Sequence, residues 1–247
     1  MVSQFRNEVR TTVRKTLIFL NKSVDRAVAV VSLILFLICL YAMIDAYMVF
    51  AGANDAGILR FKPDLSHPEA LAELSADAVA WLSVDDTKID YPVMQGENNE
   101  EYLNKDPYGN YSLSGSIFLD ARNTSDFSDH YSLVYGHHME YGAMFGALDA
   151  FIDKAYLDAH KTGTLIVLNG KNYKIDFFAA CKTQATEKTV FNPTEITNGA
   201  LLDYLRAHAA VFEPEAVSAD SRIIGLSTCQ SAESYERIIV FGTLTEE

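Results

Sequence analysis

A cysteine and an arginine stand eight positions apart in the segment 225–237, GLSTCQSAESYER. Cys229 closes the apolar run 222–228, and Arg237 opens the next run, 238–244. If the two runs are paired strands, the thiol and the guanidinium lie near one another at one end of a sheet. A guanidinium in that place favours the nucleophilic thiolate or donates to a developing oxyanion. The alternative interpretation is a buried structural cysteine beside a solvated arginine.

A histidine that could exchange protons with this cysteine lies in the segment 133–146, LVYGHHMEYGAMFG. His137 follows a strand-like run and a glycine, so its imidazole is expected at the rim of the sheet. There it could serve as general acid and base for Cys229. His138 is the adjacent alternative. The other histidines fall in a linker, a polar turn and two helical stretches, and we interpret them as surface or capping residues: His67, His130, His160 and His208.

The chain has only three cysteines, Cys39, Cys181 and Cys229. The sequence contains no CxxC pair and no closely spaced Cys/His cluster, which argues against a structural zinc site. Two well-separated cysteines outside the N-terminal apolar segment do not form a disulfide scaffold either. A pair between Cys181 and Cys229 is the remaining structural alternative to a reactive thiol.

The elements that must position these residues are mostly strands. Short apolar or alternating runs rich in Val, Ile, Phe and Tyr are separated by polar turns, a pattern typical of strands. An Asn-Gly dipeptide at 169–170 is a strong hairpin signal between two of them. The runs indicate a β-barrel or a sandwich, and there are eight of them: 78–84, 90–95, 115–120, 131–136, 164–169, 172–180, 222–229 and 236–244.

Three stretches have helical character. A short one at 66–75 begins with Ser66 or His67 at a cap position and Pro68 in its first turn. A second covers about 144–160. The third, 194–212, carries an apolar face composed of Leu201, Leu202, Leu205 and Ala209.

The charge of the chain is strongly segregated. The first 26 residues carry +4, Asp45 carries −1 and residues 46–247 carry −16, within a total of −13. An acidic main domain argues against nucleic acid as its partner.

Residues 27–44, AVAVVSLILFLICLYAMI, hold no charged side chain. A helix that crosses the hydrocarbon core needs about 20 mostly apolar residues, so we expect a transmembrane anchor here. A cleaved signal peptide is the alternative, although this run is longer than a typical signal core. The basic flank places the N-terminus in the cytoplasm by the positive-inside rule. We therefore expect a single-pass cell-membrane protein with four parts: a cytoplasmic tail (1–26), a signal anchor (27–50), a linker (51–65) and an extracellular domain (66–247).

Three separated motifs, in this order, resemble those of the sortases, the cell-wall cysteine transpeptidases of Gram-positive bacteria. They are the segment 81–123 (WLSVDDTKIDYPVMQGENNEEYLNKDPYGNYSLSGSIFLDARN), LVYGHHM with MFG, and LSTC followed by an arginine at the eighth position. The resemblance covers essentially all of 78–244. The helical stretches at 66–75 and 196–212 make the chain more similar to class B than to class A.

The resemblance implies a mainly β fold: a closed eight-stranded barrel with an N-terminal helix and a helix before the cysteine strand, preceded by one transmembrane helix. It implies that Cys229 forms a thioester with the substrate, that His137 transfers protons and that Arg237 binds the peptide and stabilises the oxyanion. Ser227 and Thr228, just before the cysteine, are the implied substrate-binding residues. Neither ATP, a metal nor another cofactor is expected.

The implied partners are secreted surface proteins with a C-terminal sorting signal, the amine of a peptidoglycan precursor (lipid II), and the membrane. The signal would be cut after Thr, but LPxTG-like and NPxTN-like signals stay open, as does the acceptor amine. A pilin-polymerising sortase is one alternative, and an inactive module that binds sorting signals is another. Gln230 stands where relatives often have an acidic residue, so the role of that position in substrate choice is open.

Overall fold

The computed structural model describes the chain except for residues 1, 54–55, 65–66, 68, 169 and 230–235, and for residues 2–9 and 229 it describes the backbone alone. Its residues separate into two compact units, 1–48 and 49–247. The first unit belongs to the long helix α1 (Val2–Ala53). Among the described residues, α1 is the one helix long and apolar enough to cross a membrane, which agrees with the expected anchor.

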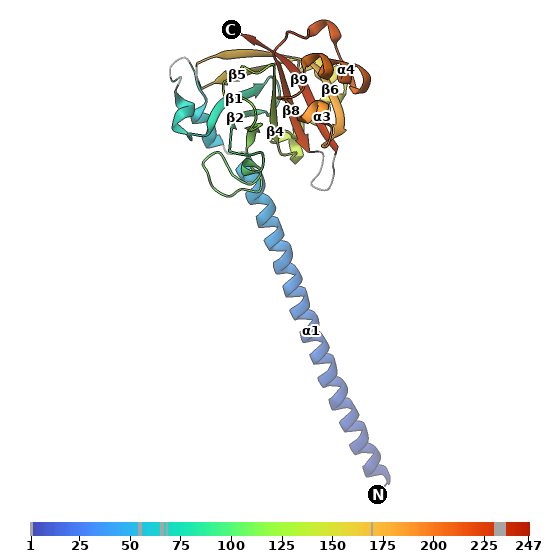
Figure 1. Cartoon of the computed structure of the whole chain (residues 1–247). Helices are drawn as coiled ribbons and strands as arrows, with labels where there is room; N and C mark the ends of the chain where they lie inside the picture. Colours follow the sequence, from blue (N-terminus) through green and yellow to red (C-terminus); the bar gives the residue numbers. More distant parts are fainter. Residues whose placement is uncertain (1, 54–55, 65–66, 68, 169, 230–235) are drawn as a thin grey trace. The chain divides into compact units, whose positions relative to one another are not determined.

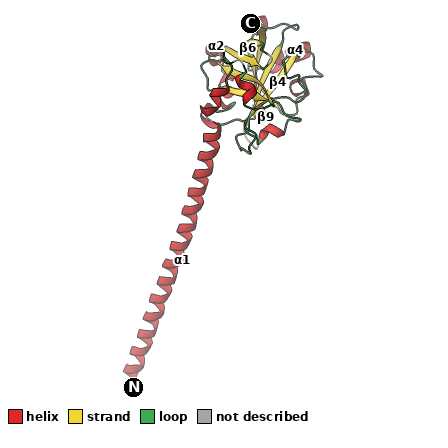
Figure 2. Cartoon of the chain, turned by 90° about the vertical axis from the view of Figure 1, so that its left-hand side faces the viewer, coloured by secondary structure: helices red, strands yellow, loops and turns green. Residues whose placement is uncertain are grey.

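The second unit is built on a closed β-barrel (Figures 1 and 2). Neighbouring strands follow the order β5-β1-β2-β3-β4-β8-β9-β6, and β6 pairs back with β5 to close the ring of eight. All eight predicted runs are strands, and closure decides between the barrel and the sandwich. Their bounds are β1 (Ala78–Val84), β2 (Asp90–Met94), β3 (Ile117–Leu119), β4 (Tyr131–Gly136), β5 (Thr162–Val167), β6 (Asn172–Gln184), β8 (Ile223–Cys229) and β9 (Glu236–Glu246).

Two of the strand pairs, β2 with β3 and β4 with β8, are parallel. The hairpin predicted at the Asn-Gly dipeptide joins β5 to β6 in antiparallel pairing, and Gly170 there has a φ of +87°, which glycine adopts readily. Residue 169 lies outside the described residues. The sequence pattern did not predict the two-residue strand β7 (Val211–Phe212), which pairs with the second half of β6.

The barrel interior and one outer face are both apolar. Inside, side chains such as Leu82, Val134 and Val240 are fully buried. Outside, α4 (Asn198–His208) covers β6, and Leu201 and Leu205 pack in the same cluster as the buried side chains of that face. Successive residues of a strand point to opposite faces, so an element buried on both faces shows a nearly continuous apolar run.

Helical segments are shorter than the sequence predicted. In the described part of the stretch at 66–75, the helical segment is a single 3₁₀ turn, η2 (Ala70–Glu73), whose N-cap is Glu69 and not the expected His67. Ser66, the other expected cap, and Pro68, expected in the first turn, lie outside the described residues. The stretch at 144–160 divides at Asp153, whose side chain accepts from the N–H of Ala155 and so caps a new helix. The result is η5 (Gly146–Ile152) followed by α2 (Lys154–Ala159).

The third stretch begins at Asn198, because Thr197 caps the helix, and ends at His208, because 211–212 join the sheet. The remaining short helices are η1 (Ala56–Phe61), η3 (Glu101–Leu103), η4 (Glu140–Gly142), α3 (Lys188–Phe191) and η6 (Pro214–Ala216).

Candidate active site

The hairpin of β8 and β9 brings Cys229 and Arg237 together. The two strands are antiparallel, and Cys229 and Arg237 are direct Cα partners at the end of the ladder. The condition set from the sequence, that these two runs pair, is therefore confirmed. Residues 230–235, including Gln230, lie outside the described residues.

The parallel pairing of β4 with β8 brings His137 to the same place. Tyr135 is the partner of Ser227, and Gly136 is the partner of Thr228. His137 follows Gly136 and Cys229 follows Thr228 in the sequence, so the same register, continued by one residue, would bring His137 next to Cys229. Strands β4, β8 and β9 are adjacent in the sheet (Figure 1). His137 therefore comes to the same end of the sheet as Cys229 and Arg237, which follow it much later in the sequence.

The imidazole of His137 is half-buried and held by a backbone carbonyl. Its Nε2 lies 2.7 Å from the carbonyl oxygen of Leu103, in η3. Because a carbonyl only accepts, Nε2 holds a proton in this contact, and Nδ1 is left to exchange one. Gly115 makes the close approach possible: a Cβ at this position would lie 3.0 Å from Cδ2 of His137 and 2.5 Å from the Leu103 carbonyl oxygen.

His138, the adjacent alternative, has a different partner. Its Nε2 lies 2.7 Å from Oδ2 of Asp149, in η5. The other four histidines make contacts typical of surface and capping residues. His67 contacts Glu73, His130 the carbonyl of Ile196, His160 the carbonyl of Tyr156, and His208 the carbonyl of Tyr204.

Ser227 and Thr228 are fully buried in β8. The Ser227 hydroxyl has no hydrogen-bond partner among the described atoms. Their side chains therefore do not face solvent, and a contact with a bound peptide would fall to their backbone. Cys181 is a free, buried thiol in β6, and burial raises its pKa to about 12. Such a thiol stays protonated and unreactive.

A pocket of about 300 Å³ lies at this end of the barrel. Both His137 and Arg237 line it, and the Arg237 guanidinium lies 6.0 Å from the ring centre of Phe191. A guanidinium against an aromatic face is held in place while it keeps its charge. The lining residues come from five separate stretches of chain: Asn99, Leu103, Phe118, Tyr135, Gly136, His137, Ala185, Phe191 and Arg237.

A buried carboxylate that the sequence pattern did not single out organises this pocket. Asp120 is fully buried and accepts from Nε and Nη2 of Arg122 at 2.8 and 2.7 Å. It also accepts from Nδ2 of Asn99 at 2.9 Å and from the hydroxyl of Tyr135 at 3.0 Å. Arg122 in turn donates to the carbonyl of Phe191 at 2.8 Å. One ion pair thus fixes three lining residues of the pocket.

The charge of Asp120 is favoured despite its burial. Burial alone raises the pKa of its carboxyl, but the hydrogen bonds and charge of Arg122 outweigh burial, and the pKa falls below its ordinary value. The pKa of Tyr135 is raised by burial and by the Asp120 charge, so its hydroxyl stays a donor. The signal in the sequence is an aspartate that ends a strand two residues before an arginine.

Among the described residues, no group of three or more His, Cys, Asp and Glu side chains is arranged to hold a metal ion.

Comparison with known proteins gives consistent matches. A family model for the sortase domain matches residues 82–245. Sortase B of Listeria monocytogenes is 37% identical over 180 residues, and sortase B of Staphylococcus aureus is 33% identical over 178; each alignment covers 70% of this chain and 72% of the relative.

Solved structures agree. Spy0129, a class B sortase of Streptococcus pyogenes involved in pilus biogenesis, matches with a TM-score of 0.66 and 39% identity, over 71% of this chain and 96% of its own. The crystal structure of sortase B from S. aureus matches with a TM-score of 0.67 and 26% identity, over 85% and 98%.

Proposed function

The chain belongs to the sortase family, within class B, and from this premise we propose that it cuts a C-terminal sorting signal after Thr and joins the Thr carboxyl to a peptidoglycan amine. Sortases are cysteine transpeptidases. The observation that carries the proposal is the strand register: Gly136 and Thr228 are partners, each one residue before His137 and Cys229, and Cys229 is the partner of Arg237.

In the first half-reaction, the Cys229 thiolate attacks the carbonyl carbon of the signal's Thr, and the carbonyl oxygen becomes an oxyanion. Arg237 donates to that oxyanion, and the positive charge stabilises it. His137 gives a proton to the leaving amine as the peptide bond breaks, which leaves a thioester between Cys229 and Thr.

In the second half-reaction, the acceptor amine attacks the thioester, and His137 takes the proton that the amine loses. The amide forms, and the Cys229 sulfur leaves as thiolate. A thioester conserves most of the free energy of the cut amide, so the transfer is balanced without ATP. Binding of the signal falls to the pocket that Asn99 and Tyr135 line, with the backbone of Ser227 and Thr228 beside it.

The location follows from α1. We propose that the apolar segment 27–50 anchors the chain in the cell membrane, with the basic tail in the cytoplasm and the catalytic domain outside. Surface proteins then meet the enzyme as they leave the cell, and lipid II, itself held in the membrane, supplies the amine.

A pilin-polymerising activity is the second candidate. The observation in its favour is the 39% identity to Spy0129, which is involved in pilus biogenesis. The two functions differ in the acceptor, because a pilin-type reaction uses a lysine side chain of a protein subunit.

The test uses the full chain in vesicles, with LPxTG-like and NPxTN-like peptides and a set of amines: glycine, alanine and diaminopimelate peptides, and a lysine peptide. Mass spectrometry follows the products, with Cys229→Ala as control. A Cys229-dependent Thr–amine product supports transpeptidation, and the preferred amine separates wall anchoring from polymerisation. Binding of the peptides without a thioester would instead indicate an inactive binding module.

A further inference from the structure

Exposed large apolar side chains are few in the described part of residues 49–247, and most of them share one region. Seven such side chains are exposed there. Tyr111 is 76% exposed and Tyr141 75%. Six of the seven belong to residues 50–59, 108–113 and 141; we name these six the anchor-proximal patch: Phe50, Leu59, Tyr108, Tyr111, Leu113 and Tyr141.

Residues 50–59 contact each of the other two segments. The rings of Phe50 and Tyr141 meet edge to face, with centroids 6.0 Å apart. A Cβ at Gly52 would lie 3.6 Å from the Ser114 hydroxyl oxygen, so the last turn of α1 runs against the segment that holds Tyr111 and Leu113. The patch is therefore one surface around the point where the chain leaves α1.

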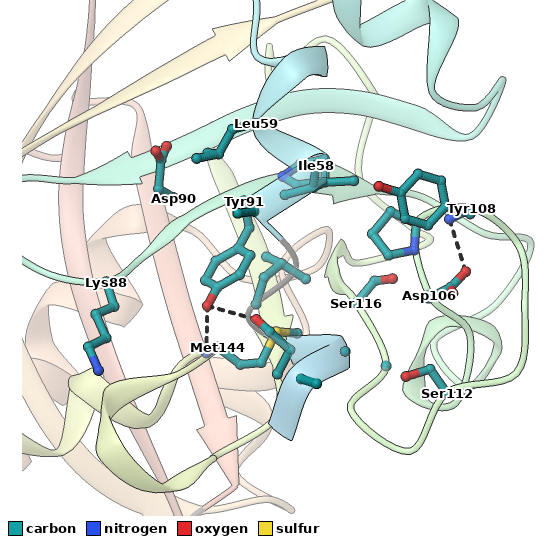
Figure 3. Close-up of a pocket in the computed structure, with 18 residues that line it drawn as sticks. Ile58, Leu59, Lys88, Asp90, Tyr91, Asp106, Tyr108, Ser112, Ser116 and Met144 are labelled. Carbon is teal, nitrogen blue, oxygen red and sulfur yellow. Dashed lines mark hydrogen bonds between the residues drawn. The ribbon is translucent and has the colours of Figure 1, made fainter. Parts of the chain in front are cut away.

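A cavity of about 510 Å³ opens within the patch. Its wall is mostly apolar, and Leu59, Tyr108 and Met144 face it, as Figure 3 shows. Polar groups stand at its edge, among them Lys88, whose Nζ donates to the carbonyl of Tyr141. An apolar hollow with polar groups at its margin suits a lipid, which has an apolar chain and a polar headgroup; Asp90 and Asp106 line the cavity as well.

Backbone conformation keeps Tyr141 outside. Its φ is +57°, in the left-handed region that non-glycine residues adopt uncommonly. Met144, in the same loop, has a φ of +50°. A loop that holds a large aromatic side chain outward in such a conformation is expected at a functional surface.

We propose that the anchor-proximal patch seats on the outer leaflet of the membrane that α1 crosses. The argument is continuity: the apolar span reaches residue 50, and the patch begins at Phe50. Tyrosine is enriched at membrane–water interfaces, where its ring lies at headgroup level. Residues 46–247 carry −16, so the contact is apolar and interfacial rather than an attraction to anionic lipid.

This inference rests on the membrane anchor of the proposed function. Its consequence is that the catalytic domain does not tumble at the end of its anchor but holds the active-site pocket at a fixed height above the bilayer. Both substrates are close to the membrane, so a fixed height raises their effective concentration at the pocket.

The test measures the depth of Tyr111 in vesicles that contain the full chain. Tyr111→Trp places a fluorophore in the patch. Leu168→Trp is the matched control, because among the described residues of 49–247 Leu168 is the exposed large apolar side chain outside the patch. The single native tryptophan, Trp81, is fully buried and gives the same background in both. Phosphatidylcholine spin-labelled near the headgroup should quench Tyr111→Trp several-fold more strongly than Leu168→Trp.

Equal weak quenching of the two variants would overturn the seating while leaving the anchor intact. Release of the whole chain from the vesicles by alkaline carbonate would instead overturn the anchor. A blue-shifted emission of Tyr111→Trp that depends on chain density and persists in detergent would mean that the patch joins two copies, which also overturns the proposal.

Discussion

At the scale of single residues, Arg237 is the side chain whose proposed role depends most on geometry. Loss of one oxyanion donor lowers kcat by about 10²–10³ in enzymes of this kind of chemistry. We expect Arg237→Ala to lower kcat by this factor. Arg237→Lys should restore only part of the lost kcat, because an ammonium lacks the planar fork of donors. Steady-state ligation kinetics measure both.

A matched control lies on the same hairpin. Arg222, just before β8 at its other end, donates to the Tyr173 hydroxyl at 2.9 Å and lies against that ring. Arg222→Lys should leave kcat unchanged. Equal losses in the two lysine variants would show a general dependence of the hairpin on arginine, and not a role for Arg237 in the reaction.

Protonation of Asp120 at low pH should destabilise the fold around the pocket. Its pKa is lower folded than unfolded, so it stabilises the fold above its unfolded pKa of about 3.9, and this stabilisation is lost as pH falls through the folded pKa. Asp120→Asn leaves Arg122 without its charge partner. We expect a loss of roughly 2–3 kcal/mol at pH 7, below the range for a fully buried pair because the Arg122 side chain is 42% exposed.

Two measurements separate stability from function in this variant. The Tm difference between wild type and Asp120→Asn should shrink below pH 4. KM for the sorting peptide should rise more than kcat falls, because an amide offers one acceptor oxygen in place of the two that accept from Arg122, Asn99 and Tyr135. A Tm difference that stays constant from pH 7 to pH 3 would contradict the coupling.

At the scale of elements, the loop before β3 supports His137. Gly115 has a φ of +58°, and an added Cβ would lie 2.5 Å from the Leu103 carbonyl that holds the imidazole. Gly115→Ala should therefore displace η3 and lower kcat at least about tenfold, beyond the roughly 1 kcal/mol that a left-handed alanine costs by itself.

Gly170→Ala is the control for this prediction, because its φ is +87° but nothing lies within 4 Å of an added Cβ. Both variants should have a lower Tm than wild type, because each places alanine in a left-handed conformation. Only Gly115→Ala should lose turnover. Equal turnover of the two variants would show that the loop at Gly115 does not support His137 in the reaction.

The elements also show what the sequence could predict. Strand runs such as 222–229 were recognised because apolar and β-branched residues repeat locally, whereas the parallel pairing of β4 with β8 joins segments about 90 residues apart and has no local signal. Closure of the barrel was expected only through the resemblance to sortases. β7 was absorbed into the helical stretch, because Val211 and Phe212 continue its apolar pattern while their backbone pairs with β6.

The same limit applies to the candidate site. Cys229, His137 and Arg237 stand out by residue type and by their places at strand ends. Asp120 does not, because an aspartate that ends a strand ordinarily faces solvent, and its burial depends on Arg122 and on α3, which is distant in the chain. Contacts between distant parts of the chain decide which charged residues are buried and structural. The sequence therefore indicates the reacting groups, but not the buried residues, such as Asp120, that hold the pocket in place.

At the scale of the whole molecule, residues 49–247 should carry the reaction on soluble substrates by themselves, and residues 1–48 should matter only at a membrane. We infer that the catalytic unit folds without α1. The match to the solved chain of Spy0129 covers 96% of that chain but 71% of this one, so a related chain folds without counterparts to the rest of this chain. A chain of residues 49–247 should cleave a soluble sorting peptide with kcat/KM within about twofold of the full chain, since Cys229 and all residues that line the pocket belong to 49–247.

Ligation to an amine held in a vesicle should behave differently, because the anchor confines enzyme and acceptor to one surface and raises their effective concentration to about the millimolar range. We expect residues 49–247 to lose at least about tenfold in that assay while retaining ligation to the same amine in solution. Fusion of an unrelated membrane helix before residue 49 should restore the rate. If the soluble unit matched the full chain on vesicles, α1 would only retain the enzyme at the cell and would contribute nothing to the encounter with its acceptor.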